Sequence, residues 1–197
     1  MSAPRHPFET GLDRNAANYA PLTPVAFLRR SADVYPEKVA VIHGERSYSY
    51  REFDARCRRF ASVLAARGIG RGDTVAIMAP NVPALLEAHY AVPGVGAVLN
   101  ALNYRLDAAA IAFCLEHGNA KILIADREFS PVIAQALKLA RREIFVVDID
   151  DPLAGSGDLL GAIDYESWIA QGDPGFELRS PPDEWDSLAL LYTSGTT

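Results

Sequence analysis

The first part of the chain shows a helical pattern followed by a strand pattern. Thr23 followed by Pro24 is typical of a helix start, and the apolar residues after it recur at helical spacing. Residues 38–43 and 47–50 have the composition and alternation of strands, and Gly44 between them can make a tight turn. We therefore predict a short helix followed by a β-hairpin.

The next predicted helix has the clearest pattern in the chain. Ser49 and Glu52 have the spacing of a capping box, in which each side chain binds the backbone N–H of the other residue. Gly68 can end the helix in a left-handed conformation. The apolar residues that share one face of this helix are Phe53, Cys57, Phe60, Ala61 and Leu64. We expect this face to be buried.

Beyond Gly72, short apolar runs alternate with helical patterns. Nearly continuous apolar runs, typical of strands buried on both faces, occupy residues 74–79, 97–100, 121–125, 143–147 and 187–192. Helical patterns that follow Asn81, Asp107 and Ser130-Pro131 occupy residues 82–92, 108–117 and 132–140. The alternation predicts an α/β fold: a mostly parallel sheet with crossover helices on both faces, preceded by a helix and a β-hairpin.

Two regions fall outside this alternation. Residues 1–22 show no clear periodicity, so we expect them to form an N-terminal arm, and we expect residues 23–197 to form one α/β unit. Residues 148–182 are richer in Gly, Pro and Asp than the rest. We expect this stretch to be a surface excursion with one short helix near residues 165–170.

The composition narrows the class of protein. The chain has 197 residues, of which 49% are hydrophobic and 22% are charged, so it can bury a substantial core. The net charge of −6, from 19 Lys and Arg against 25 Asp and Glu, disfavours nucleic-acid binding. No apolar stretch has the length of a membrane span, and the first residues lack the apolar segment of a signal peptide. We expect a soluble protein with no membrane span.

Cysteine, histidine and glycine patterns exclude several kinds of site. Cys57 and Cys114 are far apart within apolar helical patterns, which disfavours a disulfide framework and fits a reducing cytoplasm. The histidines, which we interpret as surface or capping residues, are His6, His43, His89 and His117. The sequence contains no dinucleotide-binding G-x-G-x-x-G motif, no Walker P-loop and no H-E-x-x-H zinc motif. We expect no metal site in this chain.

The last residues form a dense group of hydroxyl side chains after an apolar run. The group comprises Thr193, Ser194, Gly195, Thr196 and Thr197. Gly195 allows successive backbone N–H groups to point toward one bound anion, and the hydroxyls add donors for phosphate oxygens. If the run at residues 187–192 is a parallel strand, this group leaves the sheet at the carboxyl edge, where ligands of open α/β folds bind. On composition alone, a polar turn that binds no ligand explains this group of hydroxyl residues equally well.

The run L-A-L-L-Y-T-S-G-T-T, residues 188–197, resembles the start of the phosphate-binding signature of the AMP-forming adenylating enzymes. This superfamily includes acyl-CoA synthetases, nonribosomal-peptide adenylation domains and firefly luciferase. Residues 35–53, 72–81 and 102–117 are also similar to its acyl-CoA ligase branch, so the resemblance covers residues 23–197. One departure is Tyr104, where many ligases of this branch have threonine.

The resemblance implies a fold and a reaction. Residues 23–197 would be the first α/β subdomain of the AMP-binding domain, ending inside the phosphate-binding loop. In the family, a carboxylate attacks the α-phosphorus of ATP with its Mg²⁺, giving an acyl-adenylate and pyrophosphate, and the thiol of coenzyme A then displaces AMP. The resemblance assigns ATP phosphate binding to Thr193, Ser194, Gly195, Thr196 and Thr197. It places the catalytic residues and the metal ligand beyond Thr197.

Three interpretations follow from this partial coverage. The first is the N-terminal part of an ATP-dependent ligase that joins a carboxylic acid, fatty or related, to coenzyme A, with no turnover by this chain alone. The second is a noncatalytic truncated module or interaction domain. The third is an adenylating enzyme that loads the pantetheine of a carrier protein. Under the first, we expect self-association through apolar surface that the chain leaves uncovered.

Overall fold

A five-stranded parallel sheet forms the centre of the protein. The computed structural model describes residues 6–193. The strands lie in the order β4 (Val98–Ala101), β3 (Thr74–Met78), β5 (Ala120–Asp126), β6 (Phe145–Ile149) and β7 (Ile163–Asp164). Every neighbouring pair is parallel, which confirms the predicted sheet and, with small shifts at their ends, four of its predicted strands.

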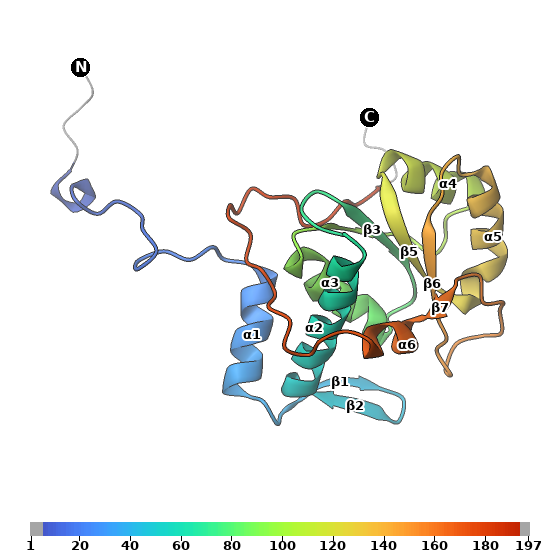
Figure 1. Cartoon of the computed structure of the whole chain (residues 1–197), viewed down its shortest axis with the longest axis horizontal. Coiled ribbons are helices and arrows are strands. Elements are labelled where there is room, and N and C mark those ends of the chain that lie inside the picture. The colour runs from blue at the N-terminus through green and yellow to red at the C-terminus, as the bar shows by residue number, and fades with distance from the viewer. Residues whose placement is uncertain (1–5, 194–197) are drawn as a thin grey trace, which may run out of the picture.

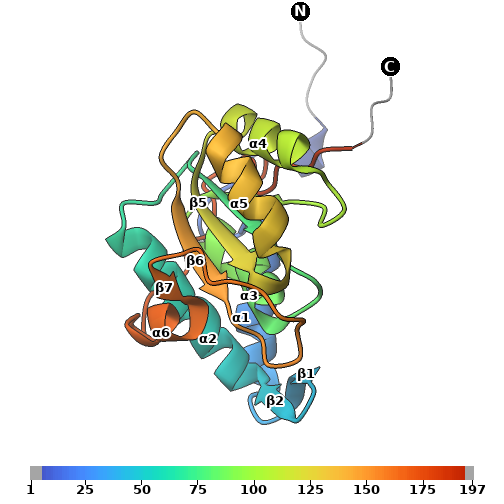
Figure 2. The ribbon, with the colours of Figure 1, turned by 90° about the vertical axis from the view of Figure 1, so that its right-hand side faces the viewer.

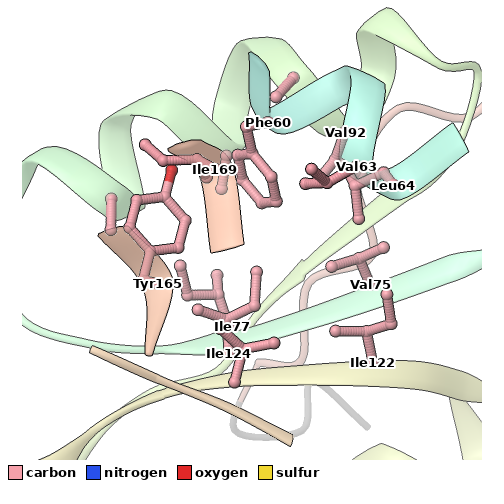
Figure 3. Close-up of a cluster of buried hydrophobic side chains, with 14 of the residues drawn as sticks. Phe60, Val63, Leu64, Val75, Ile77, Val92, Ile122, Ile124, Tyr165 and Ile169 are labelled. Atoms are coloured by element: carbon pink, nitrogen blue, oxygen red, sulfur yellow. The ribbon is translucent and has the colours of Figure 1, made fainter. Parts of the chain in front are cut away.

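Helices cover both faces of this sheet (Figures 1 and 2). The helices on one face are α2 (Tyr50–Ala66), α3 (Pro83–Gly94) and α6 (Tyr165–Ala170), and those on the other are α4 (Ala108–His117) and α5 (Ser130–Leu139). Successive residues of a strand point to opposite faces, so Val75 and Ile77 join the first core while Ala76 and Met78 join the second. Figure 3 shows part of the first core.

The N-terminal elements follow the sequence prediction. Helix α1 (Pro24–Val34) is capped by Thr23, whose hydroxyl accepts a hydrogen bond from the Ala26 N–H. Strands β1 (Val39–His43) and β2 (Arg46–Ser49) form the predicted antiparallel hairpin, and the predicted capping box starts α2. Residues 10–22 contain no helix or strand, and this part of the chain runs outward from α1 to the short 3₁₀ helix Pro7–Glu9 (Figure 1).

Two helices start at positions that differ slightly from those the sequence predicted, residues 82 and 132. Helix α3 begins at Pro83, and its N-cap is Val82 rather than Asn81, with no side-chain capping bond. Helix α5 already includes Ser130, whose hydroxyl instead accepts a hydrogen bond from the Asp158 N–H, 2.9 Å away. A proline at the start of each helix presets the backbone and lacks an N–H, so neither start needs a polar cap.

The segment after β6 is more than the predicted surface excursion. The predicted short helix is confirmed as α6, but its residues Tyr165, Trp168 and Ile169 are buried in the core, and β7 before it joins the sheet. The Asp148 carboxylate at the end of β6 accepts hydrogen bonds from the N–H groups of Leu160 and Gly161, at 3.0 and 2.7 Å. These bonds bring the chain back to the sheet.

The predicted strand at residues 187–192 is wrong. This segment forms a single parallel bridge, between Ala189 and Leu99 of β4. The Leu99 N–H donates to the Leu188 carbonyl at 3.0 Å, and the Leu190 N–H donates to the Leu99 carbonyl at 2.8 Å. Leu188 and Leu191 are 46% and 67% exposed, so the segment is not buried on both faces. We call residues 187–193 the stem, because they lead into the hydroxyl-rich segment.

Within residues 6–193, no helix combines the length and the apolar composition that crossing a membrane requires.

Candidate functional site

Of the predicted phosphate-binding residues, the structure describes only Thr193. It is exposed and ends the stem. Ser194, Gly195, Thr196 and Thr197 lie outside the described residues, so their role in binding phosphate stays a prediction. What the structure does show is how the chain is held just before them.

The stem packs against the loop that joins α4 to β5. Beyond the bridge at Ala189, Leu190 lies over Gly118, where a Cβ atom would come within 3.1 Å of the Leu190 Cδ2. The same Cβ would lie 2.8 Å from the Cys114 carbonyl oxygen and 3.1 Å from the Asn100 side-chain nitrogen. A side chain at position 118 would therefore displace the Cys114 carbonyl and press on Asn100 and on the stem at Leu190.

Tyr192 makes the last described contact of the stem. Its hydroxyl oxygen lies 2.8 Å from Nδ1 of His117 and 3.4 Å from the Cys114 carbonyl oxygen. Its ring meets the rings of His117 and Phe113 nearly edge-on, with centroids 5.8 and 6.2 Å away. Burial raises the pKa of Tyr192, and the neighbouring Cys114 thiol adds to the rise. The tyrosine is thus a neutral hydrogen-bonding group at physiological pH.

These contacts place the end of the stem differently from our expectation. Helix α4 follows β4 and leads into β5, so its last turn, which carries His117, lies at the amino edge of the sheet. The expected exit at the carboxyl edge is therefore not seen within the described residues. The stem forms only one bridge with β4, so among the described residues it does not continue to pair with β4 toward the carboxyl edge.

The carboxyl edge of the sheet carries carboxylates, two of which have side-chain partners. The Nε2 of His43, on the hairpin, lies 2.7 Å from a carboxylate oxygen of Asp151, which follows β6, and Arg127 pairs with Asp150 at 2.5 Å. Asp126, at the end of β5, is fully buried with one oxygen unpartnered, and burial raises its pKa. Residues 6–193 bring no three His, Cys, Asp or Glu side chains together in a metal-binding arrangement.

A buried charge network was missed by the sequence analysis. Glu87 on α3 is fully buried, with its carboxylate 2.5 Å from Nε of Arg56 on α2 and 2.6 Å from the hydroxyl of Tyr165, which donates to it. Arg56 also binds Glu166 at 2.7 Å. Burial raises the pKa of Glu87, against the opposing effect of Arg56.

This network has a structural role. Its charges are paired with one another across α2, α3 and α6. Such pairing offsets the free-energy cost of removing a charge from water. The signal in the sequence was Glu87 itself, a carboxylate within the otherwise apolar run of α3. Its partners Arg56 and Glu166 could not be identified, because they are 31 and 79 residues away from it in the chain.

The sequence matches the AMP-binding enzyme family over residues 28–197. It is 47% identical over 198 residues to an acetate–CoA ligase, CCL3, of Humulus lupulus. It is 46% identical over 199 residues to a peroxisomal acetate/butyrate–CoA ligase, AAE7, of Arabidopsis thaliana. Each alignment covers 94% of this chain and 35% of the relative. The chain therefore spans about a third of the length of these curated relatives.

Solved structures show the same fold. The anthranilate–CoA ligase AuaEII, in complex with anthranoyl-AMP, aligns with a TM-score of 0.78 at 22% identity, over 88% of this chain and 32% of that chain. A benzoate–CoA ligase from Burkholderia xenovorans LB400 aligns with a TM-score of 0.68 at 25% identity, over 80% of this chain and 30% of that chain.

Proposed function

Because this chain belongs to the AMP-binding enzyme family, we propose that it is the N-terminal part of an ATP-dependent acyl-CoA ligase. The enzyme would convert a carboxylic acid and ATP to an acyl-adenylate and pyrophosphate, and coenzyme A would then take the acyl group and release AMP. The observation that carries this proposal is 46–47% identity to acetate–CoA and acetate/butyrate–CoA ligases over 94% of the chain. We therefore propose a short-chain carboxylic acid as the substrate.

In this proposal, the hydroxyl-rich segment binds the phosphates of ATP. Negative charge builds on pyrophosphate as it leaves, and donors already in position stabilise that charge. The side chains of Thr193, Ser194, Thr196 and Thr197 would supply these donors, and Gly195 the backbone freedom. Mg²⁺ would arrive with ATP, and we assign none of its ligands to residues 6–193, which gather no metal-binding cluster. Residues 1–22 would be an arm outside this subdomain, which comprises residues 23–197.

A chimera tests the proposal. Residues 1–197 are joined to the part of the Humulus ligase that follows its own matching region, and AMP and CoA thioester are measured with acetate or butyrate, ATP, Mg²⁺ and coenzyme A. We expect both products, and we expect Thr196→Ala to raise the KM for ATP about fivefold, as loss of one hydrogen bond would. The Humulus segment without residues 1–197 is the control.

Other results of the chimera experiment would favour one of the alternative interpretations. A folded chimera that forms neither adenylate nor AMP would refute the ligase proposal and favour a noncatalytic module. AMP release that requires a carrier protein in place of coenzyme A would favour loading of pantetheine. We expect the 197-residue chain alone to release no AMP, and turnover by it would contradict that part of the proposal.

We propose a cytoplasmic location, because Cys57 and Cys114 are both unpaired and buried, as suits a reducing compartment. The Arabidopsis relative is named as peroxisomal, which makes the peroxisome the alternative. Fluorescence microscopy of the tagged protein in its own cells separates the two.

A further inference from the structure

We propose that His117 and Phe113, on the last two turns of α4, are positioning residues that hold the stem through Tyr192. This inference rests on the proposed function, because the stem leads directly into the segment to which ATP binding is assigned. It goes beyond that function by giving a role to the exposed face at the C-terminal end of α4, which lies at the amino edge of the sheet.

The composition of this face is unusual for a solvent-exposed helix surface. Phe113 is 57% exposed, yet its ring stacks on the His117 ring with centroids 5.2 Å apart and planes 19° from parallel. Tyr192 closes the group edge-on against both rings. Aromatic contacts of this kind add stability beyond the area they bury. The three rings therefore form a small cluster, which we call the anchor, at the margin of the second core, against which Tyr192 packs.

The hydrogen bonds of the anchor can form in either protonation state of His117. When His117 is neutral with its proton on Nε2, Nδ1 accepts from the Tyr192 hydroxyl at 2.8 Å. When His117 is protonated, Nδ1 donates to that oxygen, and the hydroxyl donates to the Cys114 carbonyl at 3.4 Å. The anchor therefore does not depend on a single ionisation state.

The anchor is needed because the stem has few other attachments. Among the described residues, its backbone is joined to the sheet only by the bridge at Ala189, and Leu188 and Leu191 are exposed. Beyond the bridge, Leu190 rests on Gly118, and the contact at Tyr192 removes more of the conformational freedom of the stem. Holding Tyr192 also limits the positions of Thr193, its neighbour in the chain. Donors that are already in position bind a phosphate at lower entropic cost.

Hydrogen exchange of the 197-residue chain tests the anchor without any assay of activity. The reporter is the Leu190 amide, which donates to the Leu99 carbonyl. We expect His117→Ala and Phe113→Ala each to speed its exchange about fivefold, and His117→Asn, which keeps a polar group near Nδ1, to restore most of the protection. His89→Ala, on α3, is the matched control. Because His117 and Phe113 are exposed, these variants leave the cores intact.

The chimera gives the functional readout. We expect His117→Ala to raise the KM for ATP about fivefold while the KM for acetate and kcat change less than about twofold. Leu190 exchange equal to that of the His89→Ala control would overturn the anchor, as would a KM for ATP that does not change. A wild-type chimera that makes no AMP would refute the proposed function instead, and the exchange result would still decide on the anchor.

Discussion

The two edges of the sheet are completed in different ways. At the β7 edge, the chain returns to the sheet after a 13-residue connection from β6, pairs as β7 and continues into α6, which buries Tyr165 and Trp168. At the β4 edge, the added segment is the stem, which forms one bridge. Trp185, just before the stem, is 92% exposed.

The difference follows from the distance along the chain between partners. The bonds that bring β7 to the sheet join Asp148 to Gly161, 13 residues away, so little chain entropy is lost when they form. Tyr192 and His117 are 75 residues apart, and their contact forms only once β4 and α4 are in place. We infer that the β7 edge belongs to the stable core and that the β4 edge opens first.

The chain has two tryptophans, one at each edge, and they provide the strongest test of this comparison. Trp168 is buried and meets the rings of Phe60 and Phe145 at 5.8 and 6.1 Å. We expect Trp168→Ala to lower the free energy of unfolding by about 3–5 kcal/mol. The matched change Trp185→Ala should cost less than about 0.5 kcal/mol. Urea unfolding followed by circular dichroism measures both, and equal losses would contradict the comparison.

At the β4 edge, a single added methyl group should disturb the stem. Gly118→Ala places a Cβ 2.8 Å from the Cys114 carbonyl oxygen and 3.1 Å from Leu190, so we expect a loss of about 1–3 kcal/mol and faster exchange of the Leu190 amide. Gly70→Ala is the control, because a Cβ there meets nothing within 4 Å. Unchanged exchange at Leu190 in the Gly118→Ala variant would show that the stem does not pack there.

At the β7 edge, the N-cap of α6 is Asp164, whose carboxylate accepts a hydrogen bond from the Ser167 N–H at 2.9 Å, and we expect it to make a smaller and pH-dependent contribution to stability. Hydrogen bonds from Ser167 hold the pKa of Asp164 below its usual range. The stabilisation is therefore complete above the unfolded pKa of about 4 and is lost as the pH falls through the lower folded value. We expect Asp164→Ala to cost about 1 kcal/mol at neutral pH and Asp164→Asn to cost less.

The measurement is the urea midpoint of the wild type and both variants from about pH 6 to about pH 2. The difference between wild type and Asp164→Ala should shrink as the solution becomes acidic. A difference that is constant over this range would mean that the Asp164 carboxylate is not the stabilising form.

The last prediction concerns self-association, and the substitution that tests it should have the smallest effect on the free energy of unfolding. Leu188 and Leu191 expose apolar surface, as does Trp185 just before them in the chain, so we propose that the chain self-associates through the β4 edge as its concentration rises. Leu191→Lys should reduce this association and change the free energy of unfolding by less than about 0.5 kcal/mol. Leu139→Lys, at a similarly exposed site on α5, is the control. Equal association of the two variants in light scattering would place the contact elsewhere.

Much of the fold could be predicted because its signals are local. The capping box of Ser49 and Glu52, the cap at Asp107 and the strand-like runs that become β3 and β5 each depend on residues close together in the chain. The strand predicted at residues 187–192 failed for the same reason. An apolar run shows that a segment prefers to be buried, but not whether a second strand is present to cover it.

The site could be predicted only in part. The hydroxyl-rich segment is visible in the sequence because its residue types share one chemistry, and Thr193 is its only described member. The Tyr192 contact with His117 and the burial of Glu87 against Arg56 depend on residues brought together from different elements. No spacing in the sequence relates such partners.

By itself, the sequence determined most of the periodic elements, the caps of α1, α2 and α4, and the assembly into a parallel sheet, because backbone preferences and apolar periodicity act over a few neighbouring residues. Only the tertiary structure decided that residues 163–170 complete one edge, that the stem rests on α4 at the other, and which buried charges are paired. Those outcomes depend on distances in space between residues far apart in the chain, and such distances exist only after the sheet has formed.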